Sequence, residues 1–179
     1  MSKEFVPRRL DVRGFAEGGG KLSGATPAGE HRRLMAETEG RCSASAVTWS
    51  AAGEVRNPLH VQPEIWLRLK AHAMLSLTCQ RCLAPVDVAV AVDRNYRFVA
   101  DEEMAAAQDD QSEEDVLALS RSFDLVELVE DELLMELPLA PRHETCPPVS
   151  AGVADEEFLA AARPENPFAV LGKLKGGDS

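Results

Sequence analysis

Long apolar segments are missing from this chain of 179 residues. No uninterrupted apolar run approaches 18 residues, so the sequence predicts no transmembrane helix. The first residues also lack the apolar core of a secretory signal peptide. A cytoplasmic location is therefore expected. There, the four cysteines would be reduced thiols or metal ligands and not a disulfide framework. They are Cys42, Cys79, Cys82 and Cys146.

Recognisable catalytic motifs are also missing. The sequence contains no P-loop, no dinucleotide-binding glycine motif and no Gly-x-Ser-x-Gly elbow. Its four histidines, His31, His60, His72 and His143, have no nucleophile at a recognisable spacing. We therefore expect a protein that is not an enzyme, and no small-molecule substrate is evident.

Positive charge is scarce. The chain has 19 Lys and Arg against 30 Asp and Glu, a net charge of −11, which argues against broad electrostatic binding to nucleic acid. The charge is uneven, however. Residues 1–41 carry eight bases against six acids, whereas residues 101–136 carry fourteen acids against one base. A local basic surface is therefore still possible, although the middle of the chain would repel RNA.

The clearest structural pattern is a strict alternation of apolar and polar residues on both sides of a short turn. Apolar residues occupy the odd positions from Ile65 to Leu77, and valines alternate with other residues from Val86 to Val92. A period of two predicts strands with one buried face. The sequence therefore predicts a long β-hairpin over about 64–99, with Cys79-Gln80-Arg81-Cys82 at its turn.

The expected fold class is α+β, with an antiparallel sheet built around this hairpin. One helix is predicted over about 124–137, capped by Asp124, ended by Pro138 and packed on one face of the sheet. Leu125, Val129, Leu133 and Met135 are expected to face inward, and Glu127, Glu130, Asp131 and Glu136 mostly outward. Residues 1–35 are expected to be loosely structured, with a short helix after Thr26, and residues 36–175 to form a single α+β domain. Within that domain we expect an acidic loop at 101–115 and short helices near the C-terminus.

Four motifs in order resemble the YceD family, the large ribosomal RNA subunit accumulation proteins of bacteria. They are the Cys79–Cys82 pair, the acidic helix leading to Leu137-Pro138-Leu139-Ala140-Pro141, the His143–Cys146 pair, and Asn166-Pro167-Phe168. The resemblance spans about residues 40–175. It implies a non-enzymatic role in the synthesis, processing or stability of large-subunit (23S) ribosomal RNA. The implied partner is that RNA or a pre-ribosomal particle, contacted directly or through a protein.

The cysteines permit three interpretations. Two thiols at Cys-x-x-Cys spacing provide half of a zinc site. Cys146 and Cys42, or His143 in place of one thiolate, would supply the other half. Alternatively, all four are ordinary packed thiols. A redox pair is less favoured, because that chemistry uses Cys-x-x-Cys at a helix N-terminus and this pair lies between strands.

Basic residues near the hairpin and at the chain end form a candidate surface for RNA or another partner: Arg68, Lys70, Arg81, Arg94, Arg97, Lys173 and Lys175. An ordinary solvated sheet face explains them as well. Two further functions stay open beside the ribosomal one. One is an acidic module that docks on a basic ribosomal protein, and the other is a zinc- or redox-sensing protein.

Overall fold

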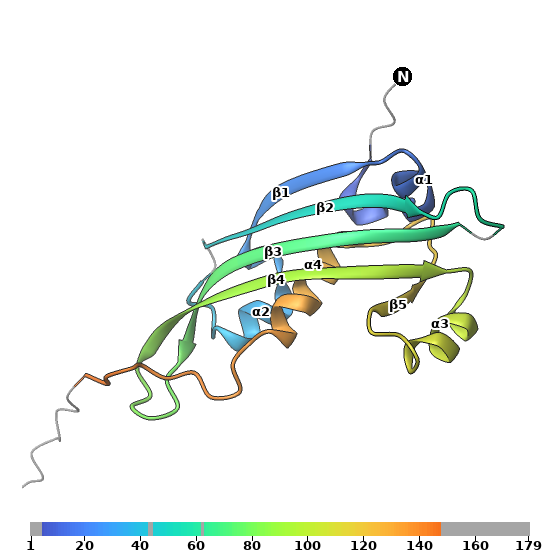
Figure 1. Ribbon diagram of the computed structural model, residues 1–179. Helices are drawn as coiled ribbons and strands as arrows, with labels where there is room; N and C mark the ends of the chain where they lie inside the picture. The colour runs from blue at the N-terminus through green and yellow to red at the C-terminus, as the bar shows by residue number, and fades with distance from the viewer. Residues whose placement is uncertain (1–4, 43–44, 62, 148–179) are drawn as a thin grey trace, which may run out of the picture. The chain divides into compact units, whose positions relative to one another are not determined.

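The computed structural model describes residues 5–42, 45–61 and 63–147. The chain divides into two compact units, residues 1–144 and 145–179, and only 145–147 of the second are described. The first unit contains a five-stranded sheet in the order β1-β2-β3-β4-β5 (Figure 1). The strands are β1 (Lys21–Pro27), β2 (Ala46–Arg56), β3 (Glu64–Thr78), β4 (Pro85–Val99) and β5 (Asp115–Ala118). The α+β class predicted from the sequence is confirmed.

The hairpin of β3 and β4 forms as the alternation predicts. Its antiparallel register pairs Ile65 with Phe98 at one end and Thr78 with Pro85 at the other. Along β3, Leu67, Leu69 and Leu75 are fully buried on one face, which we call the inner face. The intervening residues from Arg68 to Met74 are exposed on the other, which we call the outer face.

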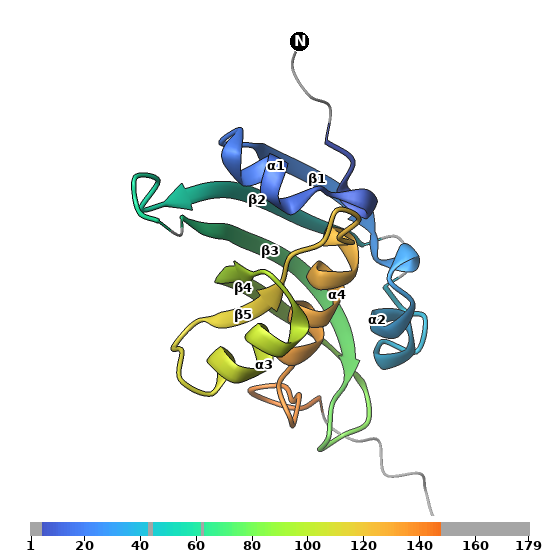
Figure 2. The same cartoon turned by 90° about the vertical axis from the view of Figure 1, so that its right-hand side faces the viewer.

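Helix α4 (Leu125–Met135) packs against the inner face and supplies part of the core. The Asp124 side chain caps it by accepting hydrogen bonds from the backbone N–H groups of Val126 (2.9 Å) and Glu127 (3.0 Å). Leu125, Val129 and Leu133 are fully buried, as the helical spacing predicts. Figure 2 shows α4 and α2 (Arg32–Glu37) on the same side of the sheet.

Two expectations for α4 are wrong. Met135 was expected in the core, but it lies in the last turn and is 62% exposed. Glu130 was expected in solvent, but it is 8% exposed because its carboxylate accepts the backbone N–H groups of Arg33 (2.6 Å) and Leu34 (3.2 Å). Glu130 therefore accepts hydrogen bonds from the backbone N–H groups at the N-terminus of the short helix α2. The helix's own N-cap residue makes no side-chain hydrogen bond to them.

Residues 5–35 are not loosely structured, which corrects the expectation for this part of the N-terminal segment. They form α1 (Val12–Glu17), the edge strand β1, α2 and the short 3-10 turns η1 (Pro7–Arg9) and η2 (Ala28–Glu30). Phe15 is fully buried, and a Cβ at Gly53 would come within 2.7 Å of its ring. In this region glycine permits close packing where flexibility was expected. The helix predicted after Thr26 starts later, at Arg32, because residues up to Pro27 pair with β2.

The acidic stretch 101–115 is also more ordered than a solvated loop. It contains α3 (Glu102–Asp109), capped by Asp101, whose side chain accepts the Met104 N–H at 2.8 Å. After α3 the chain enters β5, which pairs in parallel with β4. A small cluster of Val99, Ala105 and Val116 holds α3 against these two strands. The helices expected near the C-terminus, and Lys173 and Lys175, lie outside the described residues. Within them, no helix is long and apolar enough to span a membrane.

Candidate metal centre

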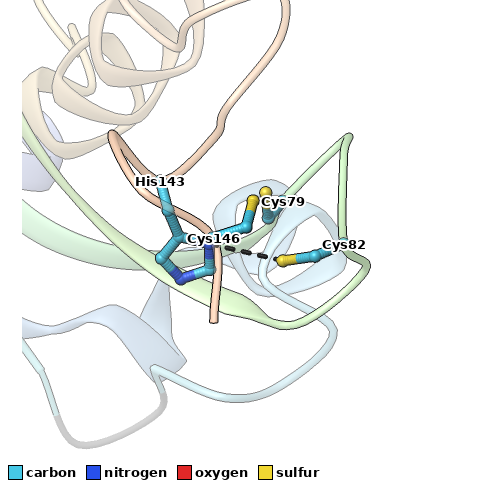
Figure 3. Close-up of side chains that lie close together, drawn as sticks. All are labelled: Cys79, Cys82, His143 and Cys146. Atoms are coloured by element: carbon cyan, nitrogen blue, oxygen red, sulfur yellow. Dashed lines mark hydrogen bonds between the residues drawn. The ribbon is translucent and has the colours of Figure 1, made fainter. Parts of the chain in front are cut away.

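The loop that joins β3 to β4 closes tightly around the Cys-x-x-Cys pair. The Cys79 N–H donates to the Ala84 carbonyl and the Leu83 N–H donates to the Cys79 carbonyl, both at 2.9 Å. Leu83 has a φ of 61°, the left-handed conformation that a turn of this kind requires and that L residues seldom adopt. This turn brings the side chains of Cys79 and Cys82 close together (Figure 3).

The segment after α4 is fixed to this loop by polar contacts. The Gln80 N–H donates to the Pro141 carbonyl at 2.8 Å. The Arg81 guanidinium donates to the carbonyls of His143 (3.2 Å) and Glu144 (3.4 Å). Residues separated by about sixty positions in the chain therefore lie together at the hairpin tip, which we define as residues 79–85 with 141–144.

His143 has the protonation pattern of a ligand. Its Nε2 lies 3.0 Å from the Pro85 carbonyl oxygen, and a carbonyl can only accept. The proton of the neutral imidazole is therefore on Nε2, and Nδ1 presents its lone pair 3.4 Å from the Cys82 sulfur. A metal-binding histidine usually donates its other N–H to a carbonyl or carboxylate in this way.

Four potential ligand atoms converge at the tip. The sulfurs of Cys79, Cys82 and Cys146 and a ring nitrogen of His143 all lie within 4.8 Å of one another (Figure 3). Only two residues separate Cys146 from His143, so chain connectivity alone keeps its sulfur close. A tetrahedral zinc ion with bonds near 2.3 Å has sulfur ligands roughly 3.7 Å apart, so no two ligand atoms need approach each other by more than about 1 Å to bind an ion. The cluster could hold a metal ion.

The electrostatic environment of Cys79 suits a thiolate. Burial raises the pKa of the Cys79 thiol, but hydrogen bonds from the backbone N–H groups of Arg81, Cys82 and His143 and from the Cys82 thiol outweigh this effect and lower it to about 5. Cys79 is fully buried. Metal ligation requires a deprotonated thiol, and backbone N–H groups directed at the sulfur favour that form.

Cys42 was a candidate ligand, and the structure places it elsewhere. It is 4% exposed within the apolar core, and its sulfur accepts the Ser76 N–H at 2.8 Å. Among the described residues it belongs to no ligand group. Of the two ligand sets considered from the sequence, the structure assembles the one in which His143 replaces a thiolate.

The candidate basic residues divide between the faces of the sheet. Arg68 and Lys70 are on the outer face, where both pair with Asp93 at 2.9 and 3.1 Å. Arg97 shares this face and donates to Gln108 on α3 at 3.0 Å. Arg94 belongs to the inner face, where it pairs with Glu132 and Glu136, each at 3.0 Å. Arg81 lies at the hairpin tip and donates hydrogen bonds to the carbonyls of His143 and Glu144.

Sequence reasoning missed Lys21, which the fold places on the outer face near Arg68. The pattern that could have revealed it is the period of two in Lys21, Ser23 and Ala25, all of them exposed in β1. It was hidden by the adjacent glycines, which suggested a mobile segment.

The fold and the cluster together define a small α+β protein with a Cys₃His group at the tip of its central hairpin. The chain belongs to the YceD family, whose model, described as "Large ribosomal RNA subunit accumulation protein YceD", matches residues 67–175. A protein of that name from Haemophilus influenzae is 33% identical over 144 residues, which cover 75% of this chain and 80% of the relative. No solved structure matches the chain.

Proposed function

We propose that this protein supports the accumulation of large-subunit ribosomal RNA without itself catalysing a reaction. The observation that carries the proposal is family membership, together with the name of the relative from H. influenzae. The matched range contains all four residues of the Cys₃His group. A cytoplasmic location and a partnership with large-subunit RNA or a pre-ribosomal particle belong to the same proposal.

Within this function, the ion that Cys79, Cys82, His143 and Cys146 would hold is zinc, and its role is structural. Three thiolates and one imidazole are a donor set that favours Zn²⁺, and four protein ligands leave no open position for a reacting water. The ion would join the hairpin loop to the segment that follows α4. Arg81 and the carbonyls of His143 and Glu144 would then form one rigid surface.

The test of the proposed function is a deletion strain in which large- and small-subunit ribosomal RNAs are quantified together. We expect the large-subunit RNA to fall relative to the small-subunit RNA, and a plasmid copy of the gene to restore the ratio. Normal ratios in the deletion strain across several growth rates would remove the basis of the proposal.

A second function is favoured by the acidic character of residues 101–136. Exposed carboxylates occur on α3 (Glu102 and Glu103) and on α4 (Glu127), and residues 101–136 carry fourteen acids in all. Such a surface would bind a basic ribosomal protein through complementary charge. Affinity purification with and without RNase separates the two cases. A partner that survives RNase binds the protein surface, whereas one that is lost was joined through RNA.

A further inference from the structure

The outer face of the sheet contains a trough along β2. Its outward-facing residues from Ala46 to Ala52 are all small (Ala46, Thr48, Ser50 and Ala52), and the ion-paired Glu54 and Arg56 follow on the same face. The neighbouring β3 carries longer side chains, with Arg68 in register with Ala52, whereas on β1 only Lys21, also in register with Ala52, is long. The backbones of β1 and β3 are about 10 Å apart, and the four β2 positions extend over about 20 Å.

One end of this trough is cationic. A hollow of about 290 Å³ is lined there by Lys21, Ser23, Ser50, Ala52, Arg68 and Lys70 and contains no carboxylate. Two other hollows on the described part of the chain are different. One contains Glu30, Asp124, Glu127 and Glu130, and the other contains Glu37 and Glu39. In a chain with a net charge of −11, this concentration of positive charge distinguishes the outer face.

Two carboxylates at the margin of the hollow act on the cations: Asp93 pairs with Arg68 and Lys70, and Glu54, itself paired with Arg56, also attracts Arg68. Asp93 accepts two hydrogen bonds from Arg68, each at 2.9 Å, and lies 3.1 Å from the Lys70 ammonium. All three side chains are about half exposed, so these pairs contribute little to folding and can exchange partners. An incoming phosphate oxygen would compete with Asp93 for the same donors. Because Glu54 is paired with Arg56, and Asp93 faces both Arg68 and Lys70, an excess of positive charge is left for such a ligand.

We propose that the trough along β2 binds a single-stranded segment of RNA through its phosphates, with Lys21, Arg68 and Lys70 as the contacts. This inference rests on the proposed function, which makes RNA the relevant polyanion. Arg68 and Lys70 are two residues apart on one strand, about 6.6 Å, so each reaches a different phosphate of an extended chain. The hydroxyls of Ser23 and Ser50 add hydrogen-bond donors between Lys21 on one side and Arg68 and Lys70 on the other.

The shape of the site selects a single strand over a duplex. Double-stranded RNA is bound across its wide minor groove by surfaces that span many base pairs. The hollow between Lys21 and Arg68, about 10 Å across, admits only a single backbone. The site also lacks an available aromatic platform, because Arg56 already lies 3.9 Å from the ring centre of the nearby Trp66. Binding therefore depends on phosphate charge and carries little base preference.

The test is fluorescence anisotropy of the full-length, zinc-supplemented protein with labelled oligouridine of about 12 nucleotides. Lys21→Glu, Arg68→Glu and Lys70→Glu combined should abolish binding. The matched control combines Arg13→Glu, Arg32→Glu and Arg121→Glu, which change the net charge equally at exposed positions away from the trough. It should bind as the wild type does. Circular dichroism of both proteins establishes that they are folded.

Two further measurements sharpen the result. Asp93→Asn removes the competing carboxylate and should tighten binding several-fold, an effect opposite in sign to that of the cation substitutions. For the wild type, the slope of log affinity against log salt should be about −2, near −0.7 for each of three phosphate contacts. Lys21→Glu alone should make this slope shallower by about one such step.

Three outcomes would overturn the inference: no binding of oligouridine at low salt, equal loss in the trough variant and the control, or a duplex bound as tightly as the single strand. None of these touches the proposed function, which is measured separately by the ribosomal RNA ratio in the deletion strain. A strain that needs the protein, but is rescued by the trough variant, would show that the function stands and that its contact lies elsewhere.

Discussion

The body of the sheet and the hairpin tip are held together by different forces. In the body, β3 contributes Leu67, Leu69 and Leu75, all fully buried against the helices. The tip of the same hairpin does not pack on the described helices. Its loop contacts residues 141–144 through backbone hydrogen bonds, the Arg81 side chain and the Cys₃His group. Apolar burial stabilises the body without a metal ion. The tip has few apolar contacts of its own.

This difference predicts that the two regions respond to different changes. A polar substitution in the core should unfold the protein, whereas loss of the proposed zinc ion should loosen the tip and leave the sheet paired. Local stability in proteins varies in this way between regions with many buried contacts and regions with few.

The largest expected effect is that of Leu133→Asp in the body. Leu133 is fully buried in the core beneath the sheet. An unpaired carboxylate buried there should cost several kcal/mol, comparable to the stability of a whole domain. We expect no cooperative thermal transition by circular dichroism. Met135→Asp is the control, since Met135 is 62% exposed on the same helix and should tolerate the charge. A cooperatively melting Leu133→Asp protein would show that α4 is not a core element.

The next effect concerns the tip. Removal of zinc by a chelator should lower the melting temperature, because an ion at hundredfold excess over its dissociation constant stabilises by about 2.7 kcal/mol. Hydrogen exchange should rise at residues 79–85 and 141–144 and stay slow in the centre of β3.

Cysteine variants identify the source of this effect. Cys82→Ser should have a lower melting temperature and no response to the chelator, while Cys42→Ser should keep the full response, since Cys42 lies in the core. A chelator effect that spreads evenly over the sheet would contradict the separation of tip and body.

Glu130→Ala should have a smaller effect within the body. The substitution leaves the N–H groups of Arg33 and Leu34 without their carboxylate acceptor, which should cost about 1–2 kcal/mol, as for other lost helix caps. Urea denaturation would measure this as a lower midpoint with an unchanged slope. Glu127→Ala, at an exposed position of the same helix, should change stability little. Equal stabilities for the two variants would mean that Glu130 does not support α2.

The smallest effect belongs to the outer face. Hydrogen bonds from Arg68 and then Lys70 lower the pKa of Asp93 to about 2. In the unfolded chain its pKa is near 3.9, so the unfolded state binds more protons between these values. The contribution of Asp93 is complete above about pH 4 and is lost as the pH falls toward 2. Carboxyl NMR titration should show this depressed pKa, and Arg68→Ala should raise it. An ordinary pKa in the wild type would mean that the pair is broken in solution.

The parts of the fold that follow from a simple period were predictable. The hairpin alternates strictly from Ile65 to Leu77 and again from Val86 to Val92, and α4 has both a capping residue and an apolar stripe. The N-terminal segment was not predictable in the same way. Its glycines resemble a mobile linker until Phe15 is seen packed against Gly53, and that contact depends on where β2 lies.

The candidate metal centre was predictable in part, and for a similar reason. Cys79 with Cys82 and His143 with Cys146 are local pairs whose spacing is visible in the sequence. Whether Cys42 joins them depends on the tertiary structure, in which its sulfur accepts a hydrogen bond from the Ser76 N–H instead. Arg94 shows the same limit. Its alternation with Asp93 places it on the inner face, but only the fold reveals Glu132 and Glu136 as its partners.

The most direct test of this account is the zinc content of the full-length protein, measured by native mass spectrometry after purification with added zinc. The account predicts one zinc ion per chain, retained by Cys42→Ser and lost by Cys82→Ser and His143→Ala, with each variant still folded by circular dichroism. A wild-type protein that binds no zinc, or a His143→Ala protein that binds it as tightly as the wild type, would contradict a Cys₃His centre at the hairpin tip.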